Sequence, residues 1–174
     1  MKKLILMIVV LALAASTYGQ ENSKDKNYGK LPSVDVKNLD GETFNTADLM
    51  NDGKPIILSF WATYCKPCLK ELNNIAEVYE EWQEDTGVKV VAVSIDKADR
   101  IGSVKNKVYA GNWGFDVFLD ENSDLKRAMN VNNVPHTFIL DGEGNIVWQH
   151  TSYADGGEFE YLEIVTKLNN GEAL

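Results

Sequence analysis

The chain has 174 residues, of which 44% are hydrophobic and 25% are charged, and its formal net charge is −9 at pH 7. This length suffices for one domain with its own core, so we expect a single domain. Nucleic-acid binding requires clustered lysine and arginine, whereas the basic residues here are scattered among acids. The composition therefore argues against a nucleic-acid-binding protein.

The first segment of the chain predicts export. Two lysines precede an apolar run from Leu4 to Ala15, and small and polar residues follow up to Gly19. The run is shorter than the ~20 residues that a membrane-spanning helix needs, and the pattern is typical of a secretory signal peptide. We expect residues 1–19 to be this signal peptide, and no cysteine follows at which a lipid would be attached.

The segment at residues 20–30 is polar and charged without a period, which predicts a flexible lead-in. The folded domain is then expected at residues 31–174. Within it, residues 55–61, PIILSFW, form a nearly continuous apolar run, as in a strand covered on both faces. After residue 68, apolar residues recur at steps of three and four, which predicts an amphipathic helix of about 18 residues ending before Gly87.

Shorter segments complete the pattern. Residues 34–36 and 42–45 flank a turn and predict a hairpin. A strand, a helix and a strand, followed by a hairpin and a final helix, predict an α/β domain in which a mixed sheet lies between helices. Further strands are expected at 88–95, 115–119, 137–140 and 146–150, and further helices within 98–109, at 123–129 and at about 158–168.

Cys65 and Cys68 lie between the apolar strand and the amphipathic helix. A disulfide that closes so small a ring stabilises a fold by only about 2 kcal/mol, which favours a reactive pair over a structural one. Cys65 falls at the helix N-terminus, where unpaired N–H groups and the helix dipole stabilise a thiolate, so it is expected to be the nucleophile. Pro67 suits the first helical turn. Cys68, one turn further, is expected to resolve the mixed disulfide.

The segment around the cysteines, SFWATYCKPCLKEL, resembles the active site of the thioredoxin superfamily. With VVAVSID, GFDVFLDEN and VPHTFILDGEGNIV, the chain is similar over about residues 31–168 to the TlpA/ResA branch of exported thiol-disulfide oxidoreductases. The resemblance implies a thioredoxin-like three-layer α/β sandwich, with a mixed central sheet flanked by helices, an N-terminal hairpin and an extra helical insertion.

The same resemblance implies an activity and a setting. The protein is expected to be a reductant in the periplasm or cell envelope of a bacterium, with protein thiols and disulfides as substrates and apocytochrome c among the candidates. A membrane protein is the expected electron donor, and no cofactor is implied. The mature chain is expected to be a monomer without stable membrane insertion.

Some residues gain a role only from the resemblance. Pro135, preceded by Val134, matches the family's cis-proline, which packs against the disulfide and leaves the preceding backbone to pair with an extended substrate. Glu71 matches a glutamate that this branch places near the cysteines, and the alternative is a solvated acid on the helix face. Thioredoxin has a buried aspartate where this chain has Ser59, so any carboxylate that assists Cys68 is expected to be Glu71.

Side chains beside the cysteines have open alternatives. Trp61 is expected to be a packed aromatic residue that shapes access to the site, and Tyr64 belongs either to a substrate-facing rim or to plain surface. Lys66 either stabilises the thiolate or points to water. His136 is either within reach of the cysteines, where an imidazolium would favour the thiolate, or outside it. His150 is expected to be an ordinary surface residue.

The same residues leave other functions open. A metallochaperone that binds Cu(I) or Zn(II) through the same cysteines is the main alternative, although a second CxxC or a closely spaced histidine pair is missing. Haem attachment needs histidine where Leu69 stands. Peroxidase chemistry normally places threonine three residues before its cysteine, whereas Thr63 is two before Cys65. After the oxidoreductase and the metallochaperone, a non-catalytic binding module is the third option.

Overall fold

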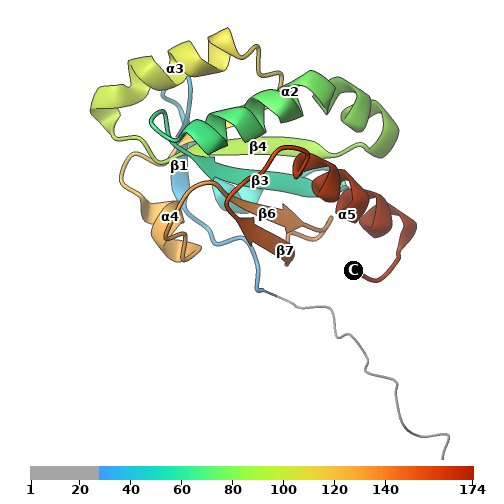
Figure 1. Ribbon diagram of the computed structural model, residues 1–174. Helices are drawn as coiled ribbons and strands as arrows, with labels where there is room; N and C mark the ends of the chain where they lie inside the picture. The colour runs from blue at the N-terminus through green and yellow to red at the C-terminus, as the bar shows by residue number, and fades with distance from the viewer. Residues whose placement is uncertain (1–27) are drawn as a thin grey trace, which may run out of the picture.

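The computed structural model describes residues 28–174, so the predicted signal peptide lies outside the described residues. A seven-stranded mixed sheet runs through the domain in the order β2-β1-β5-β4-β3-β6-β7 (Figure 1). β3, β4 and β5 are parallel, whereas every other neighbouring pair is antiparallel. The strands are β1 (Asp35–Asn38), β2 (Thr43–Asn45), β3 (Ile56–Trp61), β4 (Lys89–Ser94), β5 (Asp116–Leu119), β6 (His136–Leu140) and β7 (Ile146–Thr151).

Helices cover both faces of this sheet. α2, α3 and α5 contribute to the core on one face, and α4 contributes to the core on the other. In Figure 1, α2 and α3 lie along the top of the view and α4 lies below them. The predicted three-layer α/β sandwich is confirmed, with the hairpin β1–β2 at one edge and α3 as the extra helix. The helices are α2 (Lys66–Thr86), α3 (Ile101–Ala110), α4 (Asp124–Ala128) and α5 (Glu158–Asn170), with short 3-10 turns η2 (Thr46–Asp48) and η3 (Ala98–Arg100).

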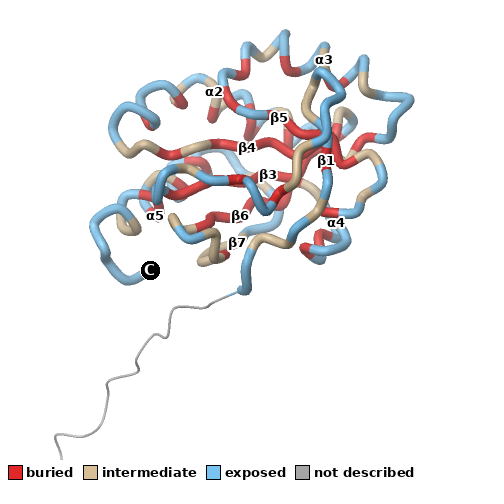
Figure 2. The backbone as a smooth tube through the Cα atoms, turned by 180° about the vertical axis from the view of Figure 1, so that it is seen from behind, coloured by how far each residue is buried: buried red, intermediate tan, exposed pale blue. Residues whose placement is uncertain are grey.

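The alternation of side chains along β3 separates two cores. All six residues of β3 are buried, as the apolar run predicts. Ile57 and Trp61 point to the core beneath α2, α3 and α5, which we call the α2-side core. Ile56, Leu58 and Phe60 point to the core on the α4 side, because successive side chains of a strand face opposite ways. Figure 2 shows the buried stretches running along β3 and β4 through the centre of the domain.

The long helix α2 begins and ends where its sequence predicts. Cys65 is its N-cap residue, and Pro67 lies in its first turn. Gly87 ends it in the left-handed conformation with φ 70°, which glycine adopts without a steric penalty. The inner face of α2 is buried through Cys68, Glu71 and apolar residues. The strand β3 and the helix α2 therefore hold the cysteine pair between two rigid elements.

The end of the predicted lead-in is bound to the sheet. The N–H of Tyr28 donates to the carbonyl of Ile146 at 3.0 Å, and the N–H of Ile146 donates to the carbonyl of Gly29 at 2.7 Å. Lys30 forms an antiparallel bridge with Asn145. These contacts involve only backbone groups, which is why a polar segment without a period gives no sign of them in its side chains.

Candidate active site

The two cysteines lie at the junction between β3 and α2. A disulfide joins them, with the Cα atoms 5.3 Å apart. The Sγ of Cys65 accepts a hydrogen bond from the backbone N–H of Cys68 at 3.3 Å. Cys65 is 8% exposed and Cys68 is fully buried. An incoming partner can therefore reach Cys65 first, and the N–H group at the helix start stabilises negative charge on its sulfur.

A buried carboxylate fixes the loop that precedes the cysteines. Asp96, two residues after the end of β4, accepts hydrogen bonds from the backbone N–H and the hydroxyl of Thr63, both at 2.7 Å. The hydroxyl of Ser94 donates to the same carboxylate at 3.0 Å. Because β3 and β4 are parallel, their carboxyl ends share one edge of the sheet, and Asp96 ties the two chain segments together there. This contact sets the position of the turn that leads into Cys65.

Glu71 is fully buried, three residues after Cys68 on the inner face of α2. Its Oε1 accepts hydrogen bonds from the hydroxyls of Thr137 at 2.6 Å and Tyr161 at 2.7 Å, and its Oε2 accepts one from Ser59 at 3.4 Å. Burial raises the pKa of Glu71, and the three hydroxyls partly oppose this. The alternative of a solvated acid on the helix face is therefore wrong. A carboxyl group with a raised pKa is suited to proton exchange nearer neutral pH.

The register of the sheet explains this arrangement. Ser59 on β3 is the cross-strand partner of Thr137 on β6, and the two hydroxyls are 3.1 Å apart. Both residues fall on the face covered by α2 and α5. The small hydroxyl groups on β3 and β6 therefore meet a carboxylate that comes from α2. Glu71 is this carboxylate.

The residues predicted to face a substrate differ in exposure. Tyr64, next to Cys65, is 65% exposed. Trp61 is fully buried and packs edge to face on Trp113 at 4.8 Å, so it supports the loop from below and presents no surface. The Val134–Pro135 peptide bond is cis, with Val134 half-buried and Pro135 buried. Contacts of Tyr64, Val134 and Pro135 with a substrate stay predictions, and so does the influence of Trp61 on access to the site.

Similarity to known proteins shows the family to which this chain belongs. A family model described as the AhpC/TSA family matches residues 29–149. The thiol-disulfide oxidoreductase ResA of Bacillus cereus is 31% identical over 167 residues, which cover 94% of this chain and 94% of that protein. The chain belongs to the AhpC/TSA family, as a ResA-type thiol-disulfide oxidoreductase.

Solved structures agree with this assignment. A thioredoxin-like protein from Porphyromonas gingivalis is 49% identical and superposes with a TM-score of 0.72, over 83% of this chain and 95% of that chain. StoA from Bacillus subtilis is 22% identical and superposes with a TM-score of 0.59, over 76% of this chain and 97% of that chain. At that identity StoA supports the thioredoxin-like fold alone.

His136 lies on the face of the sheet opposite to the cysteines of this oxidoreductase. It is the cross-strand partner of Phe60 and stacks on Phe138 at 4.2 Å, and both of these residues belong to the core on the α4 side. The cysteines belong to the opposite, α2-side core. Burial lowers the pKa of His136, which further disfavours an imidazolium. His150, by contrast, is exposed as expected.

Lys66 points away from the packed part of the site. Its side chain is exposed, and it forms no ion pair within residues 28–174. Its influence on the Cys65 thiolate stays a prediction. No helix of the described residues is long and apolar enough to cross a membrane.

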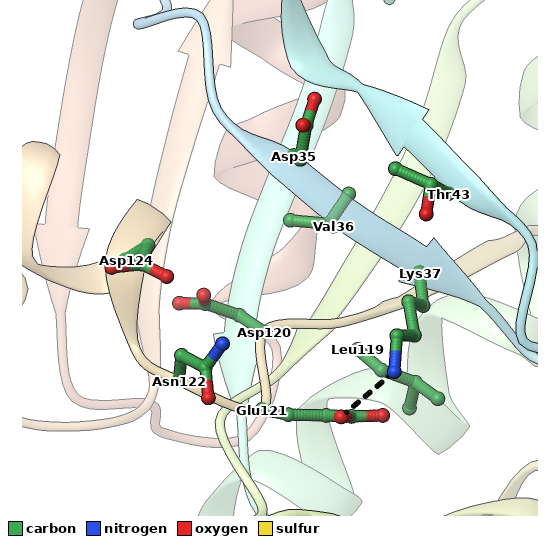
Figure 3. A pocket seen from close by; sticks show the side chains of 9 residues that line it. All are labelled: Asp35, Val36, Lys37, Thr43, Leu119, Asp120, Glu121, Asn122 and Asp124. Atoms are coloured by element: carbon green, nitrogen blue, oxygen red, sulfur yellow. Dashed lines mark hydrogen bonds and ion pairs between the residues drawn. The ribbon is translucent and has the colours of Figure 1, made fainter.

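A hollow of about 260 Å³ lies beside β1 and the loop after β5, two strands away from the strand that leads to the cysteines (Figure 3). Lys37 and Glu121 form an ion pair across its rim at 3.1 Å. Asp120 accepts the backbone N–H groups of Leu125 and Lys126 and thus secures the start of α4. Among residues 28–174, no three or more His, Cys, Asp or Glu side chains are placed to hold a metal ion. The hollow lies where the start of α4 meets β1, away from the cysteines.

Three residues of the site were not predicted from the sequence. Asp96 lies just beyond the end of β4 and Thr137 lies near the start of β6, and polar residues are common at both kinds of position. Tyr161 continues the apolar spacing of the last helix and looks like an ordinary core residue. The sequence signal that could have indicated these contacts is Ser59, because a hydroxyl in the middle of the buried strand PIILSFW needs a buried hydrogen-bond partner.

Proposed function

We propose that this oxidoreductase works in a bacterial cell envelope, where it reduces disulfides of other proteins. The observation that carries the proposal is the Cys65–Cys68 pair, held at the start of α2 with one sulfur accessible and the other buried behind it. The signal-like pattern of residues 1–19 supports export. These two cysteines are the only ones in the chain, so no other residue can supply a thiol for the reaction.

Exchange proceeds in two displacement steps. The Cys65 thiolate attacks a substrate disulfide, which forms a mixed disulfide and releases one substrate sulfur as a thiolate that takes up a proton. The Cys68 thiol then loses its proton and attacks the Sγ of Cys65. This step forms the Cys65–Cys68 disulfide and releases the second substrate sulfur. Two electrons pass to the substrate, and a membrane donor of two electrons and two protons restores the dithiol.

Glu71 is the base for the second step. It lies one helical turn after Cys68, and its burial keeps the pKa of the carboxyl raised. The carboxylate takes the proton of the Cys68 thiol, and the carboxylic acid returns it to the departing substrate sulfur. Ser59 cannot perform this transfer, since a serine hydroxyl is not a base at neutral pH.

The surface around Cys65 receives an extended segment of the substrate. Tyr64 supplies exposed aromatic surface on one side, and the backbone at Val134 and Pro135 pairs with the segment on the other. The resemblance to the TlpA/ResA branch favours apocytochrome c cysteines as the substrate. We infer a monomer, because one small domain carries the whole site.

The standard reduction potential of the Cys65–Cys68 couple tests the direction of electron flow. The protein is equilibrated in dithiothreitol or glutathione redox buffers, and the dithiol fraction is read by thiol alkylation and mass. A reductant is expected to have a potential near that of thioredoxin, about −270 mV. A potential near that of DsbA, about −120 mV, would make the protein an oxidant and contradict the proposal.

A further inference from the structure

Glu71 is held by hydroxyl groups from three different elements. Ser59 comes from β3 and Thr137 from β6, and both belong to the floor of the site. Tyr161 comes from α5, which packs beside α2 and covers the site from the helix layer. Tyr161 is 2% exposed, so its phenol group meets the carboxylate in a space closed to solvent.

The geometry fixes which oxygen of Glu71 carries a proton. Oε1 accepts two short hydrogen bonds, from Thr137 and Tyr161, whereas Oε2 has only the 3.4 Å contact with Ser59. An oxygen that already accepts two hydrogen bonds is the less basic of the pair. The proton of the carboxylic acid therefore resides on Oε2, and Tyr161 is one of the two groups that make this so.

Tyr161 is built to stay a donor in this position. Burial and the neighbouring Glu71 carboxylate raise the pKa of Tyr161, so the phenol keeps its proton. Its ring packs edge to face on Trp148 of β7 at 5.4 Å, which prevents the hydroxyl from swinging away. The orientation of the donor thus depends on packing between α5 and the sheet.

The other ionisable groups near Glu71 come from α5 and the loop before it. Glu158, one turn before Tyr161 on α5, is buried and raises the pKa of Glu71 as a like charge, after the larger effect of burial. Glu158 itself accepts hydrogen bonds from Tyr153 and Asn74. On α2, Cys68 lies one helical turn before Glu71, and the residues of β3 and β6 that contact Glu71 carry uncharged hydroxyls. Tyr161 is thus the ionisable group that donates directly to Glu71.

We propose that Tyr161 is a positioning residue for disulfide exchange, whose hydroxyl holds Oε1 of Glu71 so that Oε2 receives the proton of the Cys68 thiol. The inference rests on the proposed role of Glu71 and adds a residue to it. Tyr161 touches neither cysteine in any hydrogen bond of the site, and its effect passes through the carboxylate.

The test compares Tyr161→Phe with Glu71→Gln and with a matched control, Tyr79→Phe. Tyr79 is also a buried tyrosine of the α2-side core, but its hydroxyl contacts Gln83. The measured quantity is the rate at which Cys68 resolves a preformed mixed disulfide on Cys65, followed by stopped flow across a range of pH. Removing a hydrogen bond to a carboxylate is expected to move the Glu71 inflection upward by about one pH unit in Tyr161→Phe, with the rate above it retained. Tyr79→Phe is expected to match the wild type, and Glu71→Gln to lose the inflection.

Two results would overturn the inference, and they differ. If Glu71→Gln loses the inflection while Tyr161→Phe keeps the wild-type profile, then Tyr161 only packs and the role of Glu71 survives. If Glu71→Gln itself keeps the wild-type profile, the role of Glu71 fails and takes that of Tyr161 with it. The infrared band of the protonated Glu71 carboxyl gives a second reading that needs no turnover, since Tyr161→Phe is expected to shift it and Tyr79→Phe is not.

Discussion

At the scale of single residues, burial decides what Glu71 can do. An acid three residues after Cys68 on an exposed helix face would ionise as in water and would be useless as a proton store at neutral pH. The same acid beneath α5, with three hydroxyls and no cation of residues 28–174 against it, keeps a raised pKa and can hold or release a proton. The ionised form of Glu71 therefore lowers the stability of the fold, and the same burial gives the carboxyl group a raised pKa suited to proton transfer.

Glu71→Gln should reveal this cost in the pH dependence of stability. Ionisation of Glu71 is opposed in the folded protein and not in the unfolded chain. The wild type thus keeps its full stability below the ordinary carboxyl pKa and loses part of it as the pH rises through the raised pKa. Glutamine does not ionise, so the free energy of unfolding of the variant relative to the wild type should increase as the pH rises from the ordinary carboxyl pKa through the raised pKa of Glu71. Urea unfolding of both oxidised proteins measures it, and a difference that is constant with pH would contradict a buried ionisable group.

At the scale of elements, the site depends on how strands end. Asp96 follows β4 and holds the turn before Cys65, whereas Asp120 follows β5 and holds the start of α4. Both carboxylates are buried and both accept backbone N–H groups. They form a natural pair for comparison, because only the first of them touches the loop that carries the nucleophile.

Asp96→Asn and Asp120→Asn should therefore separate stability from reactivity. Each change leaves a buried N–H group without its acceptor, or turns an acceptor into a donor, and is expected to cost about 1–3 kcal/mol of unfolding free energy. Only Asp96→Asn is expected to slow the attack of Cys65 on a small disulfide, because only there does the turn lose its anchor. Chemical unfolding and stopped-flow exchange rates measure the two effects. Equal exchange rates in the two variants would show that Asp96 does not position Cys65.

The elements themselves were largely predictable, and the contacts between them were not. The run PIILSFW predicts a buried strand, and the spacing from Leu72 to Trp82 predicts α2. Both patterns can be recognised because they lie within one short stretch of sequence. The cis state of Pro135 and the place of Glu71 came from resemblance. The contact of Glu71 with Thr137 and Tyr161 joins segments 66 and 90 residues apart, and no local pattern encodes the register that brings them together.

At the scale of the whole molecule, the cysteines and the N-terminal residues of the domain lie at opposite ends of the sheet. The carboxyl end of β3 carries the cysteines. At the opposite end, Ile56 pairs with Leu140, and the turn of residues 141–145 follows. Residues 28–30 bind beside this turn, at the start of β7. The segment that precedes the domain is therefore fastened at the end remote from the reaction.

A chain that begins at Leu31 should thus be less stable than one that begins at Tyr28, with unchanged activity. The shorter chain loses the backbone hydrogen bonds of Tyr28 and Gly29 to Ile146, which together are expected to contribute about 1–2 kcal/mol. The rate of exchange should stay the same because the cysteines lie at the other end of β3. Urea unfolding and a disulfide-reduction assay on both chains measure this. Equal stabilities would place the start of the domain at residue 31.

The measurement that tests the central claim most directly is the trapping of a mixed disulfide. Cys65→Ser and Cys68→Ser, each reduced, are mixed with a peptide disulfide, and the adducts are followed by intact mass. The account predicts a rapid and lasting adduct on Cys65 in the Cys68→Ser variant, since the accessible sulfur attacks and nothing resolves it. It predicts little adduct in the Cys65→Ser variant, whose remaining sulfur is buried. An adduct that forms as fast on Cys68 would contradict the assignment of Cys65 as the nucleophile.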